Sequence, residues 1–96
     1  MALDIVLVNF TDQGIRNVKD SPQRANAFRE MCKKNEVRVR DIFWTMGRYD
    51  MLAVIEGPDE AMAAVLLTMG KLGNVRTETL RAMDAETFQR ILQKVG

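Results

Sequence analysis

The fold is decided by a stretch that reads Trp44-Thr45-Met46-Gly47-Arg48-Tyr49-Asp50-Met51-Leu52-Ala53-Val54-Ile55-Glu56. A glycine stands between two runs of aromatic and β-branched residues, which suit a pleated strand. Because glycine adopts backbone conformations that other residues avoid, Gly47 predicts a tight hairpin turn. The predicted strands are residues 37–45 and 49–56. The second carries apolar residues on both faces, so we expect it to lie inside a sheet.

The chain before the hairpin supplies one strand and one helix. Residues 3–10 are almost continuously apolar, which predicts an inner strand with both faces covered. Residues 15–20 are expected to form a short helical turn. Ser21 and Pro22 predict the start of a long helix with Ser21 as its N-cap, because serine caps helices and proline suits the first helical position. This helix is expected to end near Asn35.

The chain after the hairpin supplies another helix, a strand and a last helix. A proline and two acids at 58–60 predict the start of the second long helix, which is expected to end at Gly73. Residues 74–83 are expected to form the fourth strand, with a polar middle that is typical of an edge or a cavity wall. Asp84 is expected to cap the last helix. Four apolar residues of this helix recur at helical spacing, namely Phe88, Ile91, Leu92 and Val95.

The order of these elements, β-α-β-β-α-β-α, predicts an α+β fold. Right-handed β-α-β crossovers fold such a chain as a split β-α-β, ferredoxin-like sandwich. Its four-stranded antiparallel sheet is expected to have the order 4-1-3-2, with two helices on one face. Residues 1–96 are expected to form a single domain. Because the inner strands are apolar on both faces, the last helix, a second subunit or both are expected to cover the open face.

Composition narrows the classes of function. The chain has 14 Lys+Arg and 13 Asp+Glu, and this balance lacks the basic field that nucleic-acid binding needs. It has no histidine and one cysteine, so we expect no metal, no haem and no other cofactor. The lone cysteine favours a reducing compartment, and the start of the chain is too short and too acidic for a signal or membrane segment. We therefore expect a cytoplasmic protein without nucleic-acid or membrane partners. Its small core favours a homodimer or higher homo-oligomer.

Three stretches of the chain resemble the GYD domain family of small bacterial and archaeal proteins. They are residues 9–24, the hairpin continued to residue 59, and residues 73–82. The family's Gly-Tyr-Asp is matched here as Gly-x-Tyr-Asp, because Arg48 separates the glycine from the tyrosine. The resemblance implies a ferredoxin-like fold of the dimeric α/β barrel type. It implies no particular biochemical role.

The hairpin is the first candidate binding site. Arg48, Tyr49 and Asp50, together with Arg76, could bind a small polar or anionic ligand through hydrogen bonds and charge. The alternative is a turn in which these residues serve only the turn. Since adjacent strand residues point to opposite faces, only one of Tyr49 and Asp50 can enter a pocket, and the other is expected to hold the turn. Arg76 shares a face of the fourth strand with Glu78, where a cross-dimer salt bridge or a pocket wall is expected.

The start of the first long helix is the second candidate. Arg16, Lys19 and Arg24 flank it, and the free amides and dipole of a helix start attract anions. The alternative is a solvated basic rim, because the chain has no glycine-rich phosphate loop. Cys32 lies on the apolar stripe of this helix and is expected to be an inert core residue.

No residue is assigned a catalytic role, because the chain lacks histidine and a pair of acids at suitable spacing. The predicted function is a non-catalytic small-ligand-binding or interaction module that acts as a homodimer. The alternative is a cofactor-independent enzyme of isomerase or monooxygenase type, in which the four hairpin-site residues act in a sheet-lined pocket.

Overall fold

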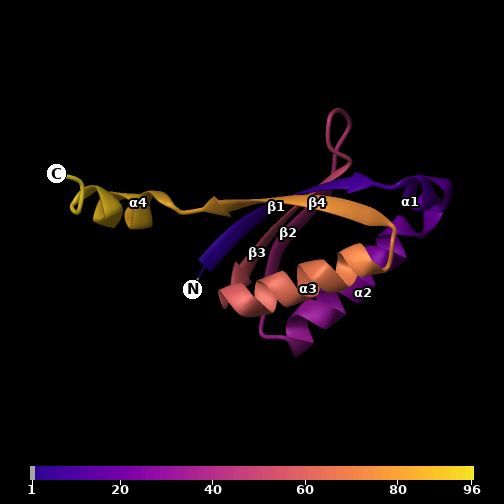
Figure 1. Ribbon diagram of the computed structural model, residues 1–96, viewed down its shortest axis with the longest axis horizontal. Coiled ribbons are helices and arrows are strands. Elements are labelled where there is room, and N and C mark those ends of the chain that lie inside the picture. The colour runs from indigo at the N-terminus through magenta and orange to yellow at the C-terminus, as the bar shows by residue number, and fades with distance from the viewer. Residues whose placement is uncertain (1) are drawn as a thin grey trace.

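The computed structural model describes residues 2–96 and contains one four-stranded antiparallel sheet with two long helices on one face (Figure 1). Met1, which the predicted domain includes, lies outside the described residues. The sheet has the order β2-β3-β1-β4, which confirms the predicted order and the antiparallel α+β fold. The strands are β1 (Ala2–Phe10), β2 (Arg38–Trp44), β3 (Met51–Gly57) and β4 (Val75–Ala82).

Helices α2 and α3 form the layer that covers this sheet, and both begin and end close to their predicted bounds (Figure 1). None of the helices in the described part of the chain is long and apolar enough to cross a membrane. The helical elements are α1 (Asp12–Arg16), the 3₁₀ helix η1 (Val18–Asp20), α2 (Ser21–Lys34), α3 (Asp59–Lys71) and α4 (Ala85–Leu92).

The core lies between the sheet and these two helices. Alternate residues of the two central strands face the helices, so that Val6 and Ile55 are 1% and 0% exposed. Cys32 of α2 is fully buried in this layer, as predicted for an inert thiol, and burial raises its pKa to about 11. The other buried members of the core are Val8, Phe28, Val37, Ala53, Met62, Val65 and Val75.

The opposite face of the sheet has no layer over it among residues 2–96 (Figure 1). The strand registers place Ile5 between Val54 and Leu80, and Leu7 beside Leu52, on this face. The edge residues Phe43 and Leu80 are 55% and 45% exposed. We call this surface the open face; its apolar members are Leu3, Ile5, Leu7, Phe43, Leu52, Val54 and Leu80.

The start of α2 differs from the prediction. Ser21 is the first residue of the helix rather than its N-cap, and Asp20 takes the cap position without a side-chain bond. The reason is a contact distant in sequence, because the Ser21 hydroxyl accepts a hydrogen bond from the indole Nε1 of Trp44 at 2.9 Å. The single helical turn expected over 15–20 is likewise replaced by α1 and η1.

The hairpin also differs, because its loop is longer than a tight turn. Strand β2 ends at Trp44 and β3 begins at Met51, so Tyr49 and Asp50 belong to the loop and not to the strand. The amide of Thr45 donates to the Asp50 carbonyl at 2.9 Å, and its hydroxyl donates to the Tyr49 carbonyl at 2.6 Å. Gly47 has φ +137° at the tip, in the region that favours glycine.

The last helix, α4, begins as predicted but does not cover the open face of its own chain. The Asp84 carboxylate accepts the amide of Thr87 at 2.8 Å, which caps the helix. The helix continues away from the end of β4 and lengthens the molecule to 50 Å (Figure 1). The expectation that the last helix covers the open face of its own chain is therefore wrong.

Candidate functional site

Asp50 ties the hairpin loop to the end of the central strand β1. Its Oδ2 accepts the backbone N–H of Phe10 at 2.8 Å, and its own amide donates to the Val8 carbonyl at 2.8 Å. Both bonds join segments about 40 residues apart in the chain. The carboxylate is therefore used by the backbone, and its role in this geometry is to hold the loop.

Tyr49 lies on the other side of the loop, over the open face. Its hydroxyl donates to Oε1 of Glu78 on β4 at 3.0 Å, and the Arg48 guanidinium lies 5.8 Å from the centre of its ring. A shallow hollow of about 200 Å³ lies here between the loop and the two central strands. The hollow is lined by Leu7, Thr45, Met46, Arg48, Tyr49 and Leu52.

The surroundings of Tyr49 strengthen the hold of its phenol on the proton. The hydrogen bond to Glu78 is the main cause that raises the pKa of Tyr49 above its usual 10, while the charge of Arg48 opposes the rise. At neutral pH the hydroxyl is therefore a hydrogen-bond donor and not a base. The adjacent Glu78 carboxylate also places negative charge where the predicted anionic ligand would approach.

Arg76 completes the predicted hairpin site only in part. It pairs in register with Asn9, and its alternation with Glu78 places both on the open face. Within residues 2–96 its side chain has neither an ion pair nor a hydrogen bond. The structure thus brings Arg48, Tyr49 and Glu78 together, leaves Arg76 free of such partners in that range, and directs Asp50 elsewhere. Sequence analysis did not assign Glu78 to the site, although its place one alternation from Arg76 indicated the shared face.

Of the second predicted group, only Arg24 reaches a concave surface. Its guanidinium donates to the Asn17 carbonyl at 2.9 Å and to the Gly14 carbonyl at 3.4 Å. Arg16 and Lys19 are exposed and do not join it. Backbone carbonyls therefore take two of the donors that an anion would use.

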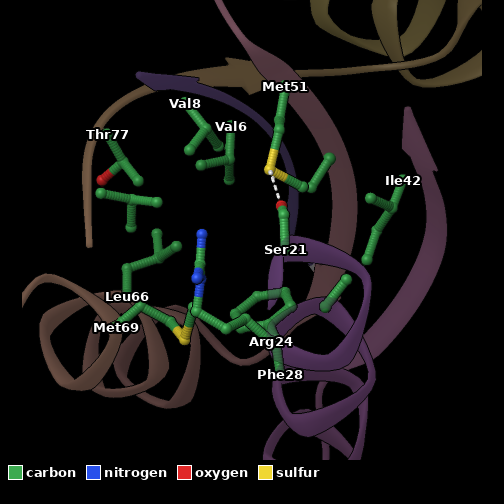
Figure 2. A pocket seen from close by; sticks show the side chains of 13 residues that line it. Val6, Val8, Ser21, Arg24, Phe28, Ile42, Met51, Leu66, Met69 and Thr77 are labelled. Atoms are coloured by element: carbon green, nitrogen blue, oxygen red, sulfur yellow. Dashed lines mark hydrogen bonds between the residues drawn. The ribbon is translucent and has the colours of Figure 1, made fainter. Parts of the chain in front are cut away.

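A small cavity of about 50 Å³ lies between the sheet and helices α2 and α3 (Figure 2). Its walls are almost entirely apolar, and the polar residues among them are Ser21, Arg24 and Thr77. Figure 2 shows the Ser21 hydroxyl against the sulfur of Met51, at 3.9 Å. The sequence alone did not indicate this cavity, because its size depends on the distance between the sheet and the helices. The only sequence feature that points to it is the pair of small residues Ala25 and Ala53, one in each layer.

Two further features of the described residues concern metal-ligand clusters and the partners of buried polar atoms. Among residues 2–96, no three or more Asp, Glu or Cys side chains are grouped so that they could hold a metal ion. Every buried side-chain nitrogen and oxygen atom in the same range has a hydrogen-bond partner. The polar side-chain groups that remain free for a partner are therefore at the surface.

The fold and the site define a small ferredoxin-like α+β domain with an uncovered sheet face and a polar loop at its rim. The family model described as "GYD domain" matches residues 5–92, so the chain belongs to the GYD domain family. This confirms the resemblance found in the sequence.

Two similar proteins come from Thermus thermophilus. One is named "Glutamine synthetase and cystathionine beta-lyase binding protein" and is 32% identical over 81 residues, which cover 82% of this chain and 85% of that protein. The other is a protein of the same species with a known crystal structure. It matches with a TM-score of 0.51 and 26% identity, over 88% of this chain and 96% of that one. Its likeness supports the fold.

Proposed function

We propose that this protein is a non-catalytic interaction module that works as a homodimer of the dimeric α/β barrel type, with the open faces of two copies packed together. The observation that carries this proposal is the uncovered set of seven apolar side chains across all four strands. The four strands lie about 4.8 Å apart, and each is about eight residues long with a rise of about 3.3 Å per residue. The whole face therefore measures roughly 500 Å². The largest apolar patch of a small protein is commonly of about this size and is often functional.

Charges around the open face suit contact with an identical face. Among residues 2–96 Arg76 has no charged partner, and Glu78 shares its side of β4. At the other end of the sheet, Arg38 and Glu56 form an ion pair at 3.2 Å. Because a two-fold interface brings unlike positions of the same surface together, a face that carries both signs can pair with itself. In this proposal Arg48, Tyr49 and Arg76 form the polar rim of the interface.

The name of the Thermus thermophilus homologue supports an interaction role, since it describes that protein as binding two enzymes. We extend this to the present chain: the dimer offers two equal surfaces to a larger protein partner, which strengthens binding through avidity. We also place the module in the cytoplasm, where its free and buried Cys32 stays reduced. Biosensor binding to purified glutamine synthetase and cystathionine beta-lyase tests the enzyme partners. No binding to either enzyme would remove this extension and leave the dimer standing.

A matched pair of substitutions tests the dimer. Leu7→Lys places a charge at the centre of the open face, where Glu78 lies directly opposite on β4 and makes the lysine tolerable within one chain. Leu67→Lys makes the same change on α3, at a side chain that is 75% exposed. Sedimentation equilibrium is expected to give twice the chain mass for the wild type and Leu67→Lys, and the mass of one chain for Leu7→Lys. A folded Leu7→Lys variant that keeps the wild-type mass would overturn the proposal.

A further inference from the structure

Helix α4 carries an apolar face that nothing in the described part of its own chain covers. Phe88, Ile91 and Leu92 follow the spacing of one helical face and are 40 to 49% exposed, and Val95, just beyond the end of the helix, is 64% exposed. The opposite face is polar and carries an ion pair between Glu86 and Arg90 at 3.6 Å. An amphipathic helix of eight residues is too short to be stable alone in water. It therefore needs a surface to pack against.

The helix is poorly placed to fold back onto its own sheet. Strand β4 stays paired with β1 as far as Ala82, and Asp84 already caps the helix, so only Met83 lies between them. Asp84 has φ −77° and ψ 173°, an extended conformation that continues the direction of the strand. Neither linking residue is a glycine that would ease a reversal. Figure 1 shows the result, with α4 projecting beyond the end of the sheet.

The area of the proposed dimer indicates what covers α4. A stable interface buries about 800 Å² on each partner, which exceeds the roughly 500 Å² of the open face. A fully covered aromatic side chain buries about 150–250 Å², so covering the exposed parts of Phe88 and its three aliphatic neighbours adds roughly 300 Å². The two surfaces are also continuous, because a groove at the base of α4 is lined by Leu3 of the open face and by Ile91.

We propose that α4 is an arm that packs its apolar face on a second copy of this chain. This inference rests on the proposed homodimer and adds a second element to its interface. Each copy gives an arm and receives one, as the two-fold symmetry of an isologous dimer requires. The arm supplies the part of the buried area that the sheet alone does not reach.

Two substitutions at neighbouring positions of the full-length chain test the arm. Phe88→Glu places a charge on the apolar face of α4, and Gln89→Glu places the same charge on its polar face. Phe88→Glu is expected to raise the dimer dissociation constant by at least about tenfold, and Gln89→Glu to change it by less than about twofold. If Leu7→Lys dissociates the dimer and Phe88→Glu does not, the arm is refuted while the homodimer stands. If the wild type is a monomer, both proposals fail.

A second measurement locates the arm without disturbing its apolar face. A nitroxide on Gln93→Cys, at the C-cap of α4, labels the end of this helix alone, since the native Cys32 is fully buried. Such spin-labelled chains are mixed with isotope-labelled chains that carry no nitroxide. Broadening of methyl signals in the second population is expected, because an arm on another copy brings the nitroxide close to them. Broadening confined to chains that carry both labels would show that α4 folds back on its own sheet, which would overturn the inference.

Discussion

Removal of the Asp50 carboxylate is expected to destabilise the fold, because the carboxylate anchors the hairpin loop. In Asp50→Ala the backbone N–H of Phe10 loses its acceptor, which lies at 2.8 Å in a partly buried position. A hydrogen bond to a charged group contributes about 1.5–3 kcal/mol, and an unsatisfied donor costs about 1–3 kcal/mol. We expect the free energy of unfolding to fall by about 2 kcal/mol. For a domain of this size, a loss of about 1 kcal/mol shifts Tm by roughly 4–8 °C.

Urea unfolding at one fixed protein concentration measures this loss, because the stability of an associating protein depends on concentration. Asp50→Asn is the matched control: it keeps a carbonyl acceptor for Phe10 and removes only the charge, so its loss is expected to be about half as large. A change below about 0.5 kcal/mol in Asp50→Ala would refute the anchoring role. A loss of dimerisation without a loss of stability would instead assign Asp50 to the interface.

Two further predictions concern the close approach of Gly14 to Asn74 and the pKa of Tyr49. Gly14→Ala is expected to lower the free energy of unfolding by about 2 kcal/mol or more, because a Cβ there would lie 2.0 Å from the Asn74 carbonyl oxygen. Gly70→Ala in α3 is the control, because a Cβ there meets nothing within 4 Å. It is expected to raise the free energy of unfolding by about 0.5–1 kcal/mol in the same unfolding assay. Equal effects of the two substitutions would contradict the close packing of Gly14 against Asn74. The pKa of Tyr49 is raised in the folded protein, so its contribution to stability is complete below pH 10 and is lost as pH rises through the folded-state pKa. Absorbance titration of the Tyr49 phenolate measures the pKa. Glu78→Gln is expected to lower the pKa of Tyr49. An unchanged titration would show that Tyr49 does not donate a hydrogen bond to Glu78.

Local sequence patterns predicted the sheet well, because two strands are apolar on both faces and such strands lie in the centre of a sheet. They failed where a distant residue intervenes. Ser21 is a good cap by composition, but the indole of Trp44 uses its hydroxyl. Tyr49 was expected in a strand, and the loop that holds it depends on bonds of Asp50 to β1.

In the candidate site, too, local sequence patterns predicted some features, while others depend on residues that are distant in sequence. Alternation indicated that Tyr49 and Asp50 would act in different places, and the contacts of each residue separate them. No pattern indicated that Arg24 would bond to the carbonyls of Gly14 and Asn17, because that depends on the path of α1 and η1. The spacing in α4 predicted an amphipathic helix, while its direction follows from the backbone at Asp84.

Accessibility of the open-face methyl groups tests the central claim most directly. In wild-type protein, a soluble paramagnetic agent broadens the NMR signals of methyl groups that water reaches. We predict that Leu7 and Val54 are protected like the core residue Val65, that Leu67 is broadened, and that dilution to the monomer exposes Leu7 and Val54. Broadening of Leu7 and Val54 as strong as that of Leu67 at every concentration would show that no second copy covers the open face, and would contradict the account.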